Sequence, residues 1–573
     1  MKHKKWITTL LGVTMALSMA ACSANAPAET TAAPTETAAP ETTQAAEQPT
    51  EKAEEPASEV ADSTSYTDLV FAEVESGPIV GYTYKGVNTF RGIPYATAKR
   101  FEAPEKVEPW TDVRPCFNWG KVSYSGQNCP TDVKFTEFIT PSDNSWIPSD
   151  DCQNVNVWSP SVDANDKLPV LVFLHGGDGN AQELVYYDGT NLAASGNLVF
   201  VTMNHREGII GGVDLSAYGE KYAMSAYTEY LDIYAGLQWI KDNISVFGGD
   251  PDNITLMGQS AGAYNVMDIM GIPAFDNMYN RTVLDSYPVI ADHDTTTKEQ
   301  TQANGAALVE ALGLTADTID EIQDIPYTEL NAAARSAGVR SGYMPTGEYF
   351  MDNPFTDTEI ESNRSKPMMI SCTYAETTDN FAGQILGYGY DEYHRPDVSS
   401  EKVRELLEAR YGDNTDKVLE MYEAAYPGRD PFYALYYTTM RASGNIYDVA
   451  DLRIANGGAP VYTAVYSYCY PLFGGMVPVH TAGDLPLIFN NVDTVPEHIA
   501  GDEAMAHKVA SEASSALANF CRTGDPNGEG APVWPAFEGE NGTTMFFDRV
   551  SEARSGYADR DLSICMRESR VDG

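Results

Sequence analysis

The feature that most constrains the fold is a short apolar run that ends in a glycine-flanked serine. Residues 253–257 are apolar and partly β-branched, which predicts a buried strand. The sequence GQSAG at 258–262 follows at once, and small residues then open a predicted helix. A strand, a Gly-x-Ser-x-Gly turn and a helix in this order predict a nucleophile elbow, a turn so sharp that only hydrogen fits two residues before and after the serine. Ser260 is therefore the predicted nucleophile.

The segment around this elbow resembles a known family. FGGDP at 247–251 precedes the strand, and the whole stretch 247–263 resembles the signature of the type-B carboxylesterases, the cholinesterase-like branch of the α/β-hydrolases. The resemblance extends over almost all of residues 66–573. Further segments that carry it are GIPYA at 92–96, DCQNVNVWSP at 151–160, YYDG at 186–189 and TGDPN at 523–527.

Strands and helices are predicted to alternate along the chain. Such alternation predicts an α/β protein with a mostly parallel sheet that helices cover on both faces. The resemblance implies a single α/β-hydrolase domain over residues 64–573, with helical insertions that roof an active-site gorge. Strands are predicted at 168–174, 198–203, 279–286, 367–373 and 461–468, and helices at 231–243, 303–340 and 400–426.

Backbone N–H groups near the serine are predicted to form an oxyanion hole. Ala261 would direct its N–H toward the hole from the start of a helix. The strand at 168–174 ends in HGGDG, and the resemblance implies that Gly177 and Asp178 supply the other N–H groups. The family pattern there is His-Gly-Gly-Gly-Phe, from which Asp178 and Gly179 depart. At 204–206 this chain has Asn-His-Arg where the family usually carries Asn-Tyr-Arg.

The resemblance also implies an acid and a base. Glu376 follows the predicted strand at 367–373 and aligns with the family's catalytic acid, with Asp379 as an alternative. His480 precedes DLPLIF at 484–489, which resembles the family's His-x-x-Glu-Leu-Pro-Phe-x-Phe with one extra residue and Asp for Glu. The order of serine, acid and histidine is the α/β-hydrolase order. Gln259 and Ser286 are expected beside the catalytic residues, since the resemblance implies that Ser286 is a buried serine bonded to the catalytic acid.

The resemblance implies one disulfide, and the spacing of the cysteines suggests no metal site. In the family, the cysteine at the position of Cys152 pairs with one upstream, which matches Cys129 here. An exported protein permits such a bridge, and the chain-entropy relation gives about 3 kcal/mol for a loop of this size. The spacing of the other cysteines and of the histidines suggests no metal ligands. No cofactor is expected. At least one thiol is expected to be free among Cys116, Cys372, Cys469, Cys521 and Cys565.

The N-terminus predicts export. Residues 1–21 combine early lysines, a short apolar run and small residues, which is typical of a secretory signal rather than a membrane-spanning helix. MAAC at 19–22 resembles a bacterial lipobox, so Cys22 is the predicted lipidation site, with ordinary cleavage as the alternative. Residues 22–63 are almost wholly Ala, Thr, Pro, Glu, Ser and Gln, and predict a disordered tether that reaches on the order of 35 Å. The expected location is the extracytoplasmic face of a bacterial membrane; secretion is the alternative.

Composition and motifs together predict an esterase. A formal net charge of −45 opposes binding to nucleic acid or to anionic bilayers, apart from the lipid anchor. We expect a serine carboxylic-ester hydrolase that forms an acyl-enzyme on small-molecule esters. The alternative is a non-catalytic binding or adhesion protein on the same fold. A peptidase would usually carry an added domain, and no repeat is visible in the sequence. Neither the substrate nor the oligomeric state follows from the sequence.

Overall fold

The computed structural model describes residues 66–124, 147–176, 187–286, 297–339, 361–376, 398–437, 446–471, 475, 479 and 482–571. These residues belong to one unit, Ser63–Gly573. The predicted signal, the tether and Cys22 lie outside the described residues and stay predictions. Among the helices that the structure describes, none is long and apolar enough to cross a bilayer.

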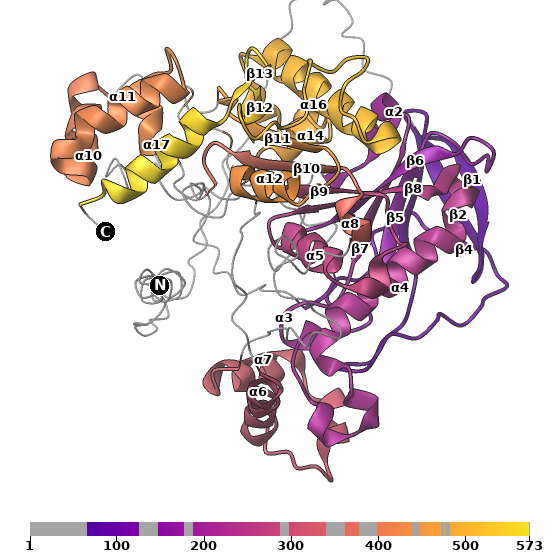
Figure 1. Cartoon of the computed structure of the whole chain (residues 1–573). Helices are drawn as coiled ribbons and strands as arrows, with labels where there is room; N and C mark the ends of the chain where they lie inside the picture. Colours follow the sequence, from indigo (N-terminus) through magenta and orange to yellow (C-terminus); the bar gives the residue numbers. More distant parts are fainter. Residues whose placement is uncertain are drawn as a thin grey trace, which may run out of the picture. The chain divides into compact units, whose positions relative to one another are not determined.

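A thirteen-stranded sheet forms the centre of this unit (Figure 1). Its order is β1-β2-β3-β5-β7-β6-β8-β9-β10-β11-β12-β13, with β4 beside β2. The strands are β1 (Tyr66–Val74), β2 (Gly77–Tyr84), β3 (Val87–Pro94), β4 (Arg114–Pro115), β5 (Asn154–Ser159), β6 (Leu168–Leu174), β7 (Val199–Asn204), β8 (Gly249–Gln259), β9 (Arg281–Asp285), β10 (Met368–Thr373), β11 (Val461–Tyr466), β12 (Thr543–Phe547) and β13 (Glu552–Ser555).

The direction of the strands agrees with the prediction of a mostly parallel sheet. From β7 to β12 each strand is parallel to its neighbours. The pairs β1-β2, β2-β3, β3-β5 and β5-β7 at one side of the sheet, and β12-β13 at the other edge, are antiparallel, while the short β4 is parallel to β2. Every residue of β6 is buried, as expected for an apolar strand that is covered on both faces.

Helices cover both faces of the sheet. Figure 1 shows α14 and α16 on one side of it and α4 and α5 on the other. The α-helices are α2 (Thr190–Gly196), α3 (Gly208–Gly211), α4 (Thr228–Asn243), α5 (Ala261–Met270), α6 (Lys298–Ala311), α7 (Tyr327–Ser336), α8 (Glu361–Arg364), α10 (Ser400–Tyr411), α11 (Thr415–Ala425), α12 (Ile446–Ala455), α14 (Leu485–Ile488), α15 (Pro496–Ile499), α16 (Glu503–Thr523) and α17 (Tyr557–Glu568).

The predicted helical insertions form, each as a pair of helices. Leu308 of α6 and Leu330 of α7 share a separate hydrophobic cluster with Ile210 of α3. Tyr426, just after α11, donates its hydroxyl hydrogen to Asp559 of α17 at 2.6 Å. These contacts attach the insertions to the domain, and their role as a roof over a gorge stays a prediction.

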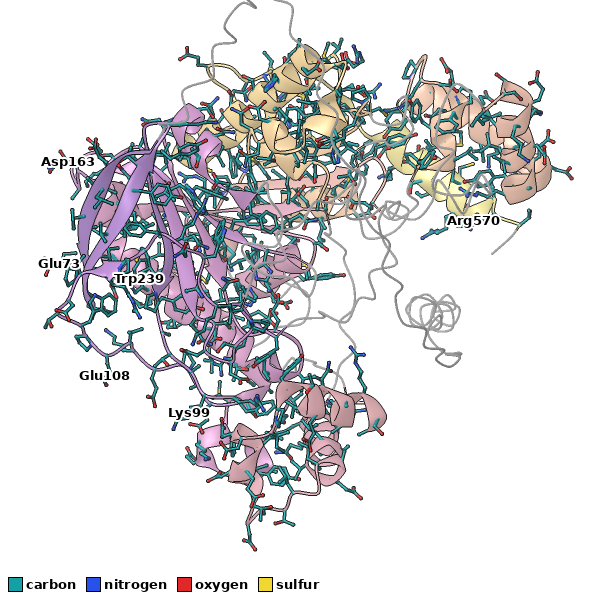
Figure 2. The ribbon with its side chains drawn as sticks, turned by 180° about the vertical axis from the view of Figure 1, so that it is seen from behind. Glu73, Lys99, Glu108, Asp163, Trp239 and Arg570 are labelled. Carbon is teal, nitrogen blue, oxygen red and sulfur yellow. The ribbon has the colours of Figure 1, made fainter. Side chains whose placement is uncertain are left out.

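A buried ion pair connects the sheet to α4. Arg206, two residues after β7, donates from Nε and Nη2 to the two carboxylate oxygens of Asp232, at 2.8 Å and 2.6 Å, and both side chains are fully buried. Nη1 of Arg206 donates to the carbonyl oxygens of Lys99 and Glu102, at 2.8 Å and 2.7 Å. Figure 2 labels Lys99 in this loop. Gln153 adds a bond to Asp232 at 3.0 Å. One arginine therefore joins β7, α4 and the loop at 99–102.

Removing the acid of this pair should destabilise the whole domain. We expect Asp232→Asn to lower the free energy of unfolding by about 3–5 kcal/mol, because it leaves a buried guanidinium without its countercharge. Urea denaturation followed by tryptophan fluorescence measures the loss. Glu405→Gln, which breaks an exposed pair with Lys402, is the control and should change the denaturation midpoint little. Equal midpoints for both variants would contradict the assigned role of the buried pair.

Candidate active site

Ser260 occupies a strained turn between β8 and α5. Its backbone has φ 54° and ψ −120°, outside the regions that a non-glycine residue normally adopts. A Cβ on Gly258 would lie 2.0 Å from the carbonyl oxygen of Gly262, and a Cβ on Gly262 would lie 2.1 Å from that of Leu174. The prediction that only hydrogen fits at both glycines is confirmed. Such backbone strain costs about 1–3 kcal/mol and is typical of functional sites.

Main-chain hydrogen bonds fix this serine in place. The N–H of Ser260 donates to the carbonyl of Asp285 on β9 at 2.9 Å, and its own carbonyl accepts from Ala263 and Tyr264 at 2.9 Å and 3.2 Å. The side chain is only partly buried. Ala261 is the first residue of α5, as predicted, so its N–H belongs to the helix N-terminus. The hydroxyl therefore stands at the carboxyl edge of the sheet, beside backbone donors.

The predicted oxyanion loop begins against the serine. A Cβ on Gly176 would lie 2.4 Å from the carbonyl oxygen of Gln259 and 2.9 Å from the Cβ of Ser260. Gln259 is buried, and its Oε1 would be 2.7 Å from the same Cβ. Gln259 thus packs beside the start of the loop. Gly177 and Asp178 lie outside the described residues, so their part in the hole stays a prediction.

The predicted acid is buried at the end of β10. Glu376 is 7% exposed, and its Oε1 accepts the N–H of Thr373 at 2.6 Å. Its position is therefore not that of an ordinary surface glutamate. The alternative Asp379 and the predicted base His480 lie outside the described residues. Val479, the residue before His480, accepts the N–H of Ala375 at 3.2 Å. The segments that carry the predicted acid and base thus lie next to each other.

A pair of buried carboxyl groups lies beside Glu376. Ser371 donates to Asp285 at 2.6 Å, and Ser286 donates to Asp484 at 3.3 Å. Burial raises the pKa of Asp285 to about 6. Burial, reinforced by the negative charges of Asp285 and Glu376, raises the pKa of Asp484 well above its usual range. Asp484 therefore keeps its proton when Asp285 ionises, because two adjacent buried carboxylates are unfavourable.

Only part of the arrangement around Asp285 and Asp484 could be predicted from the sequence. Ser286 is buried, as expected, but its hydroxyl donates to Asp484, the residue that replaces the family's glutamate after His480. Asp285 was not among the predicted residues. One feature of the sequence could have revealed Asp285. It is an acidic residue at the end of an apolar strand, directly before Ser286, and such a strand is expected to be buried on both faces.

The predicted disulfide is not visible in the described residues. Cys152 is buried and carries a free thiol, while its predicted partner Cys129 lies outside the described residues. Burial raises the pKa of the Cys152 thiol well above its usual range, so as a free thiol it is unreactive. The bridge stays a prediction. The further free thiols that the structure describes are those of Cys116, Cys372, Cys469, Cys521 and Cys565.

Comparisons with known proteins all identify the same family. The chain matches the carboxylesterase family over residues 68–564. It is 30% identical over 498 residues to the para-nitrobenzyl esterase of Bacillus subtilis (strain 168), an alignment that covers 82% of this chain and 93% of that protein. It is 28% identical over 495 residues to the phenmedipham hydrolase of Pseudarthrobacter oxydans, with coverage of 82% and 93%.

Solved structures show the same fold. An esterase from Clostridium hathewayi, described as able to hydrolyse aliphatic aromatic polyesters, superposes with a TM-score of 0.78 at 29% identity, covering 88% of this chain and 99% of that one. A carboxylesterase of Geobacillus stearothermophilus superposes with a TM-score of 0.64 at 27% identity, with coverage of 86% and 99%. The chain therefore belongs to the carboxylesterase family, and it is a carboxylic-ester hydrolase with the α/β-hydrolase fold.

Proposed function

We propose that the protein hydrolyses small-molecule esters through a triad of Ser260, His480 and Glu376 and an acyl-enzyme intermediate. The observation that carries the proposal is the strained backbone of Ser260 between two glycines that admit only hydrogen. A binding protein has no need of this strain, whereas a nucleophile must project above the sheet toward its base.

Each residue of the proposed triad has one chemical role. His480 takes the proton of the Ser260 hydroxyl as it attacks the ester carbonyl, and later gives a proton to the leaving alkoxide. Glu376 holds the imidazole in the productive tautomer and stabilises the imidazolium. The hydrogen bond from Ala375 to Val479 supports this pairing, since it joins the two residues that precede Glu376 and His480.

Backbone N–H groups would stabilise the charge that develops on the carbonyl oxygen. Ala261 would contribute from the N-terminus of α5, and Gly177 and Asp178 from the loop after β6. Preorganised donors of this kind typically contribute about 3–4 kcal/mol each to the transition state. The close packing of Gly176 on Ser260 supports this arrangement, because it brings the start of the loop to the nucleophile.

Replacing the triad residues tests the mechanism. We expect Ser260→Ala and His480→Ala each to lower kcat for p-nitrophenyl acetate on the order of 10⁶-fold, because the two groups act as a unit. Glu376→Gln should cost about 10⁴-fold, since it orients the base. Ser260→Ala should also abolish labelling by a fluorophosphonate probe. Ser195→Ala, an exposed serine on α2, is the control and should keep full labelling.

Two results would decide against this mechanism. Substantial hydrolysis by both Ser260→Ala and His480→Ala would rule out the assigned triad. An unreactive wild-type protein that still binds esters would instead favour the non-catalytic alternative.

The buried carboxyl pair should make stability depend on pH. Because the pKa of Asp285 is raised from 3.8 to about 6, the folded state holds this proton more tightly than the unfolded chain does. The free energy of unfolding therefore falls as the pH rises from about 4 through about 6. Asp285→Asn removes the titrating group, so its stability relative to wild type should rise over this range. Urea denaturation at several pH values from 4 to 7 measures the difference.

An exposed acid gives the control for this measurement. Asp252 has a side chain that is 89% exposed, and Asp252→Asn should follow the wild-type pH dependence. A difference between Asp285→Asn and wild type that stays constant from pH 4 to 7 would show that the pair does not titrate as described.

The N-terminus completes the proposal, with the enzyme held by lipid on Cys22 at the outer face of a bacterial membrane. Mass spectrometry of the mature protein should find lipid on Cys22 as the first residue, and peptide mapping without reduction should find Cys129 linked to Cys152. A mature N-terminus at Ser23 or beyond would refute the anchor and favour secretion. Free thiols at both cysteines would refute the bridge. Neither result bears on the esterase activity.

A further inference from the structure

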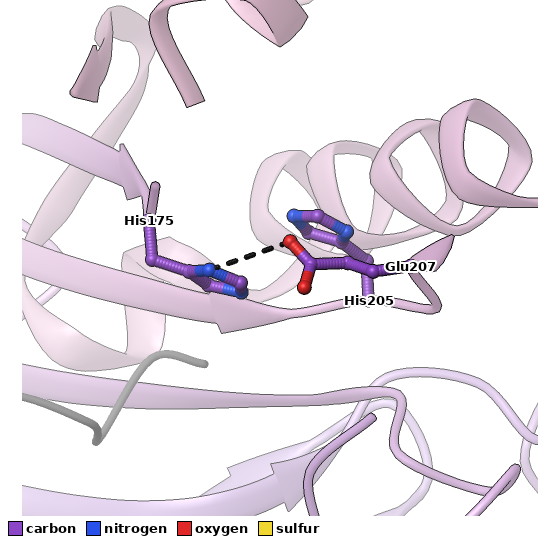
Figure 3. Close-up of side chains that lie close together, drawn as sticks. All are labelled: His175, His205 and Glu207. Carbon is purple, nitrogen blue, oxygen red and sulfur yellow. Dashed lines mark ion pairs between the residues drawn. The ribbon is translucent and has the colours of Figure 1, made fainter. Parts of the chain in front are cut away.

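A cluster of buried imidazole and carboxylate groups lies at the carboxyl ends of β6 and β7. These strands are parallel, with Leu174 opposite Met203, so the residues that follow them leave the sheet side by side. The rings of His175 and His205 are parallel, with centroids 4.9 Å apart. Figure 3 shows the carboxylate of Glu207 directed toward His175, with its Oε1 3.6 Å from Nδ1.

Of the four ring nitrogens of these histidines, only Nδ1 of His205 has a hydrogen-bond contact of acceptable geometry among the described residues, a long one of 3.5 Å to the carbonyl oxygen of Arg206. His175 is 1% exposed, and among the described residues neither of its ring nitrogens has a hydrogen-bond partner of standard geometry, although the backbone of Gly176 interacts with the ring. Nε2 of His205, which is fully buried, also has no such partner in the part of the chain that the structure describes. Leaving buried polar atoms unsatisfied costs free energy, so three in one cluster need an explanation. Imidazole nitrogens that carry a free lone pair are the usual histidine ligands of metal ions.

The spacing within the cluster fits a metal ion better than it fits hydrogen bonds. The distance of 3.6 Å from His175 to Glu207 exceeds the range of about 2.7–3.2 Å for N–H···O bonds. Ligand atoms at about 2.0–2.2 Å from a tetrahedral Zn²⁺ lie roughly 3.3 Å from one another. One donor atom from each of the three residues lies within 4.8 Å of the others. To bring these donor atoms to the separations found around a bound ion, the imidazole rings must rotate about χ2, a torsion with a broad energy minimum.

A second carboxylate is placed to orient one of the histidines. Nδ1 of His205 lies 3.7 Å from Oε1 of Glu229 on α4. Asn265 of α5 donates to the same oxygen at 2.8 Å, which fixes the carboxylate. Metal-binding histidines usually direct their other ring nitrogen to such a group. With Nδ1 facing Glu229, Nε2 of His205 is the nitrogen left for a metal.

We propose that His175, His205 and Glu207 form a binding site for Zn²⁺, with water as the fourth ligand. Imidazole and carboxylate ligands in a three-residue set suit this ion. The bound ion would tie the end of β6 to the end of β7. It would therefore hold the residue directly before Gly176, where the chain meets Ser260. The order of strands in the sheet creates this site, so the spacing of histidines along the sequence gives no sign of it.

Zinc binding by the purified full chain tests the site. The protein is stripped with a chelator, titrated with Zn²⁺ and analysed for metal after desalting. We expect one zinc ion per chain and a higher Tm, because an ion that binds only the folded state stabilises it. A folded chain that retains no zinc and shows no change in Tm would overturn the proposal.

Variants then locate the bound ion. Glu229→Gln removes only the orienting carboxylate and should weaken zinc binding about 10–100-fold. Glu207→Gln and His205→Gln each remove a ligand and should weaken it further. The control is His507→Gln, which alters an exposed histidine 3.1 Å from Asp493 and should keep wild-type affinity. Circular dichroism confirms that each variant is folded.

Cobalt distinguishes this site from the cysteines. Co²⁺ bound at the proposed site should give the visible bands of a tetrahedral nitrogen and oxygen environment. A thiolate-to-metal charge-transfer band would show that the chain holds metal through its thiols, and would overturn the proposal. Unchanged zinc affinity in folded Glu207→Gln and His205→Gln would do the same. The measurements on wild type stand even if one variant fails to fold.

Discussion

The active site depends on the close approach of three stretches of backbone where β6 and β8 end. Gly176, Gly258 and Gly262 meet there, and a Cβ at any of them would lie 2.0–2.4 Å from a carbonyl oxygen. Because these contacts leave no room for side chains, they determine both the sharp turn at Ser260 and the place where the loop after β6 begins. Ser260, the proposed nucleophile, and the start of the proposed oxyanion loop are thus positioned by the same backbone contacts, rather than by separate interactions.

The carboxyl groups near the acid show how the fold tolerates buried charge. Glu376, Asp285 and Asp484 lie in a region closed to solvent, where three ionised carboxylates would repel strongly. A proton retained on Asp484 removes one of these charges, and bonds from Ser371, Ser286 and the N–H of Thr373 stabilise the group. Hydrogen bonding and partial protonation together therefore reduce the repulsion around Glu376, the proposed acid. The serines beside the acids are part of the electrostatics of the site.

The central strands and the turn at Ser260 could be predicted from the sequence, because the patterns that indicate them are local. The apolar run at 168–174 is β6 to the residue, and the glycines around Ser260 have the conformational role that the motif predicts. What the sequence could not show depends on the order of strands. Ser286 and Asp484 are 198 residues apart in the chain and are bonded only because β9 and α14 meet in the fold. The two buried histidines likewise meet because β6 and β7 are neighbours, a fact that no spacing along the chain encodes.

The carboxyl edge of the sheet therefore carries two kinds of unfavourable feature within a few residues. One is the strained backbone of Ser260, and the other is the set of imidazole nitrogens on His175 and His205 that have no standard hydrogen bond among the described residues. Each lowers stability, and the extensive apolar core around β6, β7 and β8 offsets them. The backbone strain and the imidazole nitrogens differ in how their cost in stability can be removed. The strain at Ser260 is torsional, and the backbone contacts and hydrogen bonds around the turn hold it in place. The imidazoles can be satisfied by an ion without moving the backbone. A ligand at that position can therefore stabilise the edge of the sheet while leaving the geometry of the nucleophile intact.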